Sequence, residues 1–395
     1  MEAGSRLESD PQKRLRAARR VVIKLGTSVV TGDESDACGM RLESLARSIA
    51  SLRREGRQIV IVSSGSIGLG RAKLGLSKVR LGDLVLRQAC AAVGQSLLMQ
   101  VYERLFSAKD LKTAQVLLTE DDFTDRTRYS NLRRVMERLL KLGVIPIVNE
   151  NDTVSTAELE CLDSGGKRVF GDNDRLAALI MSKLEADALI LLTNVDGLLS
   201  SESLQKSANH SRDGNDVVPF VTEIDSDVFA LANGPSVNGR GGMVTKLEAA
   251  EIAMRAGGIA VIANGTTPGI LDQIFSSKQV GTTFISSGRL GGKRRWIKYA
   301  AGVRGKLTVN SGAREAIIRG KASLLSSGVV GVEEKFKAMD VISIADTAGR
   351  EFARGIANYA SQEAEALISG AGSNDHQTRT KARVLVRRNN IVLLE

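Results

Sequence analysis

The chain has 395 residues, of which 43% are hydrophobic and 4% aromatic, and its formal net charge is +10. This length is sufficient for two domains, and the hydrophobic content is normal for a soluble globular protein. No apolar stretch reaches the roughly 18–20 residues that a membrane helix needs, so no association with a membrane is expected.

The N-terminal residues and the cysteines bear on the cellular compartment. Residues 1–19 are rich in Arg and Lys, but no apolar segment follows the charges, so a secretory signal is not indicated. We expect a frayed basic leader, and a targeting segment of another kind is the alternative. Cys38, Cys90 and Cys161 are odd in number and lack the spacing of a metal site, which favours unpaired thiols and a cytoplasmic protein.

Residues 20–275 alternate short apolar runs with amphipathic stretches. Strands that alternate with helices predict an α/β fold with a mainly parallel sheet covered by helices on both faces. In such sheets ligands bind at the carboxyl ends of the strands, so we expect the turns after these runs to share one active-site cleft. The runs expected to form strands are 21–25, 59–63, 114–118, 144–148, 188–193 and 259–263.

The first run ends in a lysine and a glycine. Its sequence, VVIKLG over residues 21–26, indicates a short buried strand that breaks at Gly26, with Lys24 just before the turn. Glycines let backbone N–H groups close around phosphate oxygens, and lysines supply full positive charge. Lys24 and Gly26 are therefore candidates for binding a polyphosphate.

Polar and acidic residues follow the next strands. The run at 59–63 leads into Ser64 and Gly65, and the run at 144–148 leads into Asn149-Glu150-Asn151-Asp152. Farther on, Asp172 and Asp174 flank Asn173 at the start of a helical run. Acidic residues at a helix start are also ordinary caps, so their position alone does not separate ligand binding from capping.

A second lysine ends a glycine-rich loop. The loop at 238–246, NGRGGMVTK, leads into a helical run at 247–253, whose start adds positive partial charge. It is not a Walker loop, because GxxxxGK[ST] occurs nowhere in the chain. Lys24 and Lys246 together would neutralise the charge that develops on a transferred phosphoryl group, as a kinase without a P-loop requires.

Taken in order, these motifs resemble the amino-acid kinase family, most closely its glutamate 5-kinase branch. The resemblance extends from about Arg20 to about Ile368 and rests on motifs at 21–28, 58–68, 145–152, 170–174, 188–198 and 238–246. It implies an amino-acid kinase domain at 20–285 with a three-layer sandwich. It also implies ATP-dependent phosphorylation of the γ-carboxylate of L-glutamate, the first step of proline synthesis, with proline as a feedback inhibitor. Mg²⁺ bridging the ATP phosphates with few protein ligands and a homo-oligomeric state are further implications.

The resemblance also assigns site residues. Ser64, Asp152 and Asn173 are expected to bind glutamate, with Asp152 suited to its ammonium group and Asn173 to its α-carboxylate. Asp174 is placed to orient Lys24 and Lys246, so these three are the expected catalytic residues, and no metal site made by the protein is expected. Contacts to the nucleotide are expected from Lys24, Gly26, Thr193, Asn194, Arg240, Gly241, Gly242, Met243, Val244, Thr245 and Lys246.

The two histidines, His210 and His376, lie in polar segments without a clear pattern. A carboxylate acceptor, with a pKa of about 4.3, is already ionised near pH 7 and needs no general base. The lack of a well-placed histidine is therefore compatible with a carboxylate kinase, although it does not establish one, since an Asp could serve as the base.

Three features depart from the family pattern. Asn194 stands where many relatives have Asp, and Arg240 where Thr or Ser is common, which puts details of nucleotide binding in doubt. The segment 157–170 is longer than usual and lies between two substrate motifs. We expect it to cover the glutamate site or to influence inhibitor binding.

The C-terminal part has a different pattern. A polar, basic, glycine-rich linker at 286–301 precedes brief β-like runs at 302–369, which resemble a PUA domain, a small β-barrel-like module, and a tail follows at 370–395. Residues 290–395 hold 18 Lys and Arg against 10 Asp and Glu, which is compatible with an RNA-binding surface or with ordinary solvated surface. The alternatives to a glutamate kinase are an N-acetylglutamate kinase, a carbamate kinase, or an RNA-binding or RNA-modifying protein.

Overall fold

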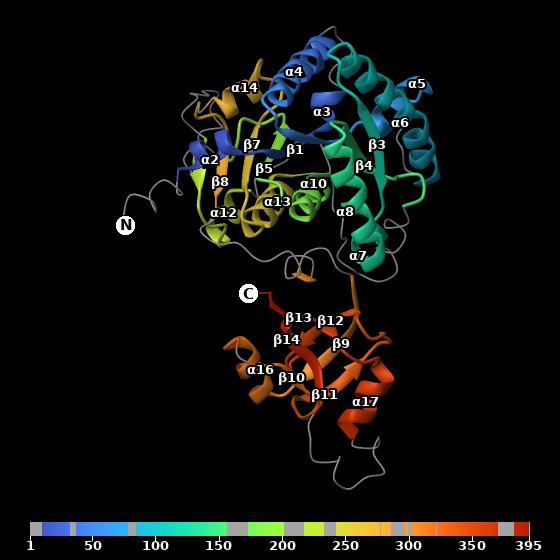
Figure 1. The fold of residues 1–395 in the computed structure, drawn as a ribbon, viewed down its shortest axis with the longest axis vertical. Coiled ribbons are helices and arrows are strands. Elements are labelled where there is room, and N and C mark those ends of the chain that lie inside the picture. Colours follow the sequence, from blue (N-terminus) through green and yellow to red (C-terminus); the bar gives the residue numbers. More distant parts are fainter. Residues whose placement is uncertain are drawn as a thin grey trace. The chain divides into compact units, whose positions relative to one another are not determined.

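The computed structural model describes residues 10–31, 37–77, 84–155, 173–200, 217–232, 242–276, 278–285, 297–298, 302–320, 322–369 and 383–394. The chain divides into two compact units: the first comprises 1–122 and 127–290, and the second 123–126 and 291–395. Each unit has its own sheet and its own hydrophobic core (Figure 1).

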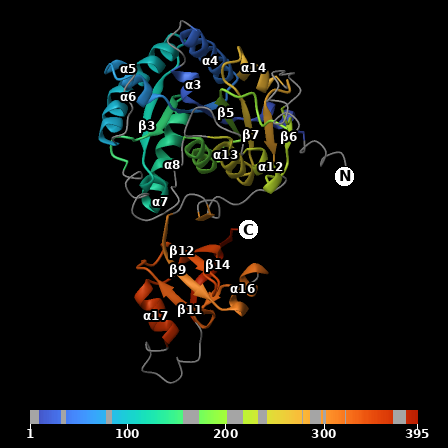
Figure 2. The same cartoon turned by 180° about the vertical axis from the view of Figure 1, so that it is seen from behind.

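An eight-stranded sheet forms the centre of the first unit, and Figure 2 shows its short strand β6 on the side away from β3. All neighbouring strands are parallel except β7 and β8. The six runs expected to be strands are strands, which confirms the predicted α/β fold; β6 and β8 were not predicted. In order across the sheet the strands are β3 (Thr113–Leu118), β4 (Ile145–Glu150), β2 (Gln58–Ser63), β1 (Arg20–Leu25), β5 (Ala188–Thr193), β7 (Ile259–Asn264), β8 (Thr282–Ile285) and β6 (Phe220–Val221).

Helices cover both faces of this sheet and complete the three layers (Figure 1). On one face α2 (Pro11–Ala17), α3 (Thr27–Val30), α4 (Ala37–Arg54), α6 (Leu84–Ser107) and α14 (Ile270–Phe275) share a core cluster with the strands. On the other face α10 (Asn173–Leu184) and α13 (Met243–Arg255) pack against β1, β5 and β7, and α8 (Arg126–Lys141) lies beside α10. Shorter helices are α5 (Ser66–Lys73), which packs on α6, α7 (Asp121–Thr124) and α12 (Ser226–Leu231).

Strand β1 shows how the sheet positions the first candidate lysine. Successive side chains of a strand point to opposite faces. Val21, Ile23 and Leu25 belong to the core cluster on the α4 and α6 side. Lys24 therefore points to the other face, where α10 and α13 lie. The aliphatic residues before and after Lys24 in β1 are buried, as is usual for strands of a parallel sheet.

Part of the expected basic leader is folded. Asp10 caps helix α2 by accepting hydrogen bonds from the N–H groups of its first turn. Leu15 and Ala18 are buried in the core of the first unit, and Arg14 donates to the Gly257 carbonyl at 2.9 Å. Residues 10–18 thus pack on the sheet instead of forming a frayed segment, because apolar positions in the basic sequence face the core.

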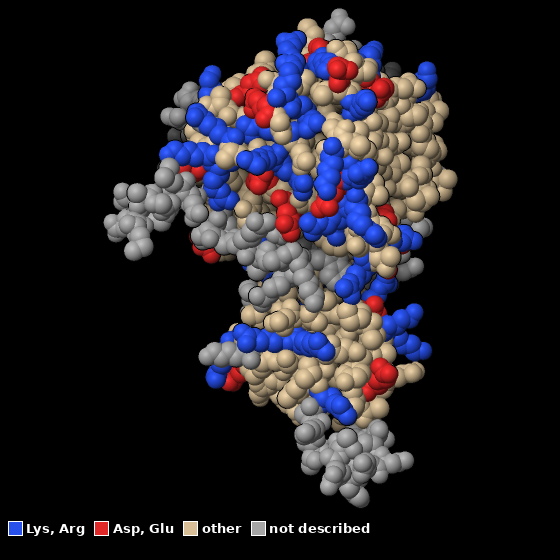
Figure 3. Space-filling model, viewed as in Figure 1, with Lys and Arg blue, Asp and Glu red and all other residues tan. Residues whose placement is uncertain are grey.

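Helix α8 has an apolar and a basic side. Leu132, Met136 and Leu140 are buried at helical spacing, and the exposed side carries several arginines. Figure 3 shows Lys and Arg side chains gathered over this helix. Within the part of the chain that the structure describes, no helix is both long and apolar enough to cross a membrane.

The second unit is a six-stranded, mostly antiparallel sheet with two helices. Among the strands that the structure describes in this unit, only β9 and β12 pair in parallel. Its core is made by side chains such as Leu307, Phe336, Phe352 and Val386. In order the strands are β10 (Leu324–Leu325), β14 (Val384–Leu393), β13 (Glu351–Ala357), β12 (Val341–Ala345), β9 (Val303–Val309) and β11 (Val329–Glu333), with helices α16 (Ser311–Ile318) and α17 (Ser361–Ser369).

Strand β14 lies in the segment that the sequence assigned to a tail. It pairs with both β10 and β13, and its Leu385, Val386 and Ile391 are buried in the core of the second unit. The sheet of this unit therefore includes residues well beyond 369. The sequence alone did not indicate that β14 belongs to this sheet, because its pairing with β10 and β13 is long-range.

Candidate active site

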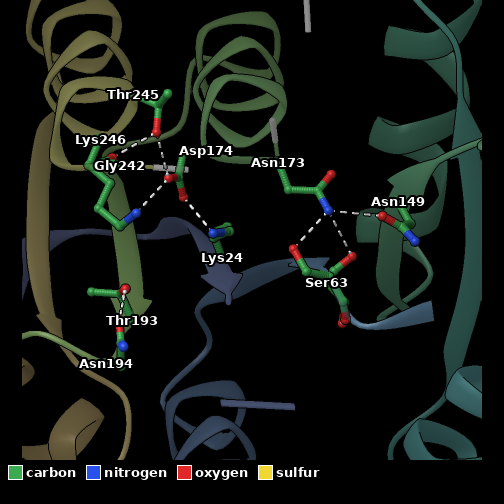
Figure 4. A network of polar contacts seen from close by, with 11 residues as sticks. Lys24, Ser63, Asn149, Asn173, Asp174, Thr193, Asn194, Gly242, Thr245 and Lys246 are labelled. Atoms are coloured by element: carbon green, nitrogen blue, oxygen red, sulfur yellow. Dashed lines mark hydrogen bonds and ion pairs between the residues drawn. The ribbon is translucent and has the colours of Figure 1, made fainter. Parts of the chain in front are cut away.

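Three charged side chains from three elements meet above the carboxyl end of β1 (Figure 4). The Lys24 ammonium lies 2.7 Å from Oδ1 of Asp174, at the start of α10. The Lys246 ammonium, in the first turn of α13, lies 3.0 Å from Oδ2 of the same carboxylate. The two lysines, 222 positions apart in the numbering, thus share one counter-ion.

All three groups of this cluster are buried. Asp174 is 0% exposed, Lys24 7% and Lys246 6%. Burial by itself raises the pKa of the Asp174 carboxyl, but the Lys24 and Lys246 ammonium groups outweigh burial and lower its pKa. Asp174 is therefore held as a carboxylate, and its two oxygens fix the positions of both ammonium groups.

Threonine 245 ties the start of α13 to the same carboxylate. Its hydroxyl lies 3.3 Å from Asp174 Oδ2 and 3.0 Å from the Gly242 carbonyl. Gly242 is the N-cap of α13 and, as a glycine, has no side chain to accept from the N–H groups of the first turn. Uncapped N–H groups at a helix start carry partial positive charge and suit the oxygens of a phosphate.

Two glycines of the neighbouring turns are required by geometry. A Cβ on Gly26 would lie 3.2 Å from the Leu192 carbonyl, to which the Gly26 N–H donates at 3.0 Å. The N–H of Gly26 is therefore engaged by the sheet and not free for a ligand. Gly65 has φ of +105°, in the left-handed region that favours glycine, and it starts α5.

A second polar cluster surrounds Asn173, the residue before Asp174 (Figure 4). Its Nδ2 lies 2.9 Å from Ser64 Oγ, 3.0 Å from Asn149 Oδ1 and 3.3 Å from the Ser63 carbonyl. Asn149 at the end of β4 is 2% exposed. The carboxyl ends of β2 and β4 and the start of α10 thus meet at Asn173.

Residues of helices α5 and α6 form hydrogen bonds to this second cluster. Asn149 Nδ2 donates to Gln95 Oε1 at 3.0 Å and lies 3.3 Å from Ser66 Oγ. The hydroxyls of Tyr102 and Ser63 are 2.7 Å apart, and burial raises the pKa of Tyr102. The hydrogen bond between Tyr102 and Ser63 holds the turn that carries Ser64.

The remaining expected residues are distributed as follows. Thr193 ends β5, and its hydroxyl lies 3.3 Å from Oδ1 of the exposed Asn194; Figure 4 shows both near the lysine cluster. Asp152 lies half-buried in the turn after β4, at the same strand end as Asn149. Met243 and Val244 begin α13. Arg240 and Gly241, Asp172, the 157–170 segment and both histidines lie outside the described residues.

The sequence did not single out Gln95, Ser66 or Tyr102. Gln95 and Tyr102 occupy the buried side of α6 together with Ala91 and Leu98. Polar residues in an otherwise apolar stripe at helical spacing are a signal that could have identified them. Asn264 at the end of β7, which donates to Asp196 at 2.8 Å, is a further polar group at this sheet edge.

The donor set suits phosphate better than a metal held by side chains. Within the described ranges, no group of three His, Cys, Asp or Glu side chains could hold a metal ion. Both oxygens of Asp174 already contact ammonium groups. Lysines and the backbone N–H groups at a helix start are the groups that bind polyphosphates.

Comparison with known families agrees with this chemistry. The sequence matches the amino acid kinase family over residues 19–263 and the PUA domain over residues 305–374. The second match begins within β9 and covers β10 to β13 of the second unit.

Individual relatives match over most of the chain. The glutamate 5-kinase of Caldanaerobacter subterraneus subsp. tengcongensis is 39% identical over 382 residues, 95% of this chain and 98% of that protein. The glutamate 5-kinase of Myxococcus xanthus is 43% identical over 351 residues, 88% of this chain and 89% of that protein. Among solved structures, the carbamate kinase from Giardia lamblia bound to AMP-PNP has a TM-score of 0.45 and 17% identity, covering 69% of this chain and 100% of that one.

Proposed function

The chain belongs to the amino acid kinase family and, within it, to the glutamate 5-kinases, and we propose that it transfers the γ-phosphoryl group of ATP to the γ-carboxylate of L-glutamate. The product is L-glutamyl 5-phosphate, an acyl phosphate. The resemblance found in the sequence assigns this reaction to the first step of proline synthesis.

The observation that carries the proposal is the buried cluster of Lys24, Asp174 and Lys246. Phosphoryl transfer spreads negative charge over the equatorial oxygens and the leaving bridge oxygen, and positioned positive charge stabilises it. The two ammonium groups are fixed 2.7 and 3.0 Å from one carboxylate, so they need no rearrangement as the charge develops. Asp174 orients them, because its lowered pKa and engaged oxygens make it a poor proton acceptor.

The second cluster is the proposed glutamate site. Ser64 follows β2 and lies within hydrogen-bond reach of Asn173 at the start of α10, and Asp152 follows β4 at the same sheet edge. The γ-carboxylate is ionised near pH 7, so it attacks without a general base. Asn173 and Asp174 are adjacent, which brings the acceptor site next to the phosphate-binding lysines.

ATP and Mg²⁺ complete the proposed reaction. We assign the ATP phosphates to Lys24, Lys246 and the start of α13, and the nucleoside to the region of Thr193 and Asn194. Mg²⁺, when bound, supplies further charge neutralisation on the phosphates. Because both Asp174 oxygens contact lysines, we propose that phosphate oxygens and water, with few side chains, hold the ion.

We further propose feedback inhibition by proline at the glutamate site. Proline keeps the α-carboxylate and an ammonium-like nitrogen, so it can occupy the groups around Asp152 and Asn173. Raising the glutamate concentration should then relieve the inhibition by proline. Proline insensitivity at every glutamate concentration would contradict this proposal.

We also propose that the protein is a homo-oligomer in the cytoplasm. Light scattering of the purified protein tests the oligomeric state.

Trapping the product with hydroxylamine tests the reaction itself. Acyl phosphates are strong electrophiles, so ATP, glutamate and hydroxylamine should give γ-glutamyl hydroxamate along with ADP. N-acetylglutamate and carbamate in place of glutamate should give neither above background. ADP without hydroxamate would indicate a hydroxyl acceptor or simple ATP hydrolysis, and a preference for N-acetylglutamate or carbamate would indicate a different amino acid kinase.

A further inference from the structure

The side-chain amide of Asn173 has a fixed direction. Its Nδ2 faces three acceptors, which are Ser64 Oγ, Asn149 Oδ1 and the Ser63 carbonyl. Of these, the Ser63 carbonyl can only accept a hydrogen bond, because it has no hydrogen to donate. If the amide were reversed, Oδ1 would meet the carbonyl oxygen of Ser63 and repel it. Asn173 Oδ1 therefore points away from Ser63 and Asn149, as Figure 4 shows, and accepts no hydrogen bond from the described residues.

The amide of Asn149 has the matching direction. It accepts from Asn173 through Oδ1 and donates through Nδ2 to Gln95 Oε1 at 3.0 Å. Reversing Asn149 would place its Nδ2 against the Nδ2 of Asn173, two donors facing each other. The orientation of Asn149 thus acts together with the Ser63 carbonyl in determining which end of Asn173 faces outward.

Gln95 ends this chain of amides. It is 9% exposed, and its Nε2 is buried without a partner among the described residues. An unsatisfied buried amide N–H costs roughly 1–3 kcal/mol, so a glutamine here is useful only for its acceptor, Oε1. That oxygen, 3.0 Å from Asn149 Nδ2 and closer than Ser66 Oγ at 3.3 Å, helps to keep Asn149, and through it Asn173, in the observed direction.

We propose that Gln95 is a specificity-determining positioning residue: through Asn149 it makes Asn173 present a carbonyl oxygen to the substrate, which selects an acceptor with a free α-ammonium group. The proposal rests on the proposed glutamate site. It changes the role that the resemblance implied for Asn173, which was expected to bind the α-carboxylate. Ser64 takes that role, because its oxygen accepts from Asn173 and its hydroxyl hydrogen is left to donate to an anionic oxygen.

The test compares L-glutamate with glutarate, which keeps both carboxylates and lacks the ammonium group. Gln95→Met removes the acceptor at similar volume, and Gln95→Glu, which keeps an acceptor oxygen, is the matched control. In Gln95→Met we expect KM for glutamate to rise about tenfold, because a hydrogen bond to a charged group is weakened. kcat should stay within about threefold, and kcat/KM for glutarate should not change. Gln95→Glu should keep the preference for glutamate.

Asn173→Ala provides a second variant at a half-buried position. It should lose activity mainly with glutamate, so that the two substrates approach equal kcat/KM. An equal loss for both substrates in folded Gln95→Met or Asn173→Ala, judged by circular dichroism, would overturn the inference, and so would an unchanged preference for glutamate. A wild-type protein without glutamate-dependent ADP release would instead refute the proposed function itself.

Discussion

Replacing Lys246 by methionine removes one of the two ammonium groups at Asp174 and keeps much of the apolar length of the side chain. The Lys24 ammonium remains 2.7 Å from the carboxylate, so Asp174 keeps an ion pair and we expect the protein to fold. Loss of one positioned charge contact in the transition state lowers kcat by about 10²–10³-fold, equivalent to roughly 2.7–4 kcal/mol. Lys24→Met should have an effect of the same order.

The assay is glutamate-dependent ADP release, with kcat and KM for ATP measured separately. Lys183→Met is a matched control, because Lys183 is also a lysine of low exposure, 7%, but lies over the Tyr129 ring instead of at Asp174. This control should keep turnover within about threefold of wild type, since it removes a buried lysine side chain without changing the proposed phosphate contacts. Wild-type-like kcat in folded Lys246→Met would refute the assignment of this lysine to the transferred phosphoryl group.

Three further predictions concern stability and domain organisation. Burial and then Arg133 lower the pKa of Lys183 to about 7, against the opposing effect of Glu137, whereas the unfolded chain has the ordinary 10.5. The folded state therefore binds fewer protons than the unfolded state between pH 7 and 10.5, and stability should rise with pH across this window. Urea unfolding should show this rise in wild type, with a total of roughly a few kcal/mol, and Lys183→Met should lack it. Gly94→Ala places a Cβ 1.7 Å from the Ser66 carbonyl and should lower the melting temperature, whereas Gly39→Ala, with nothing within 4 Å, should not; equal melting temperatures would refute the packing argument. A chain ending at Arg289 should still phosphorylate glutamate, because Lys24, Asn173, Asp174 and Lys246 all belong to the first unit; folded but inactive protein would show that the second unit contributes to catalysis.

The strands and the lysine cluster could be predicted because both depend on short-range patterns. An aliphatic run such as 21–25 can be buried on both faces only in a parallel sheet, and a lysine within it must point at one covering layer. Glycines at the strand ends then indicate where a ligand can approach. The rule that ligands bind at the carboxyl edge of such a sheet places Lys24 at this edge, whereas the role of Asp174 between Lys24 and Lys246 was implied by the resemblance to the amino-acid kinase family.

The support beneath the Asn173 cluster could not be predicted in this way. Gln95 and Tyr102 lie on an apolar helix, and the sequence indicates only that their polar groups need partners once buried. Which loops they meet depends on the close packing of α5 on α6, where Gly70 approaches the Cys90 carbonyl. Similarly, β14 joins its sheet through pairing with strands far away in the sequence.

Adjacent residues at the start of α10 join the two clusters of the site. Asn173 is bound by Ser64 and Asn149, whereas Asp174 is bound by Lys24 and Lys246. Because one peptide bond separates them, a shift or rotation of the first turn of α10 must displace both clusters at once. Fixed amide and ion-pair contacts on both sides therefore hold the proposed acceptor carboxylate in register with the proposed phosphate site. Since each cluster restrains the same turn, substitutions in the two clusters should have non-additive effects on kcat.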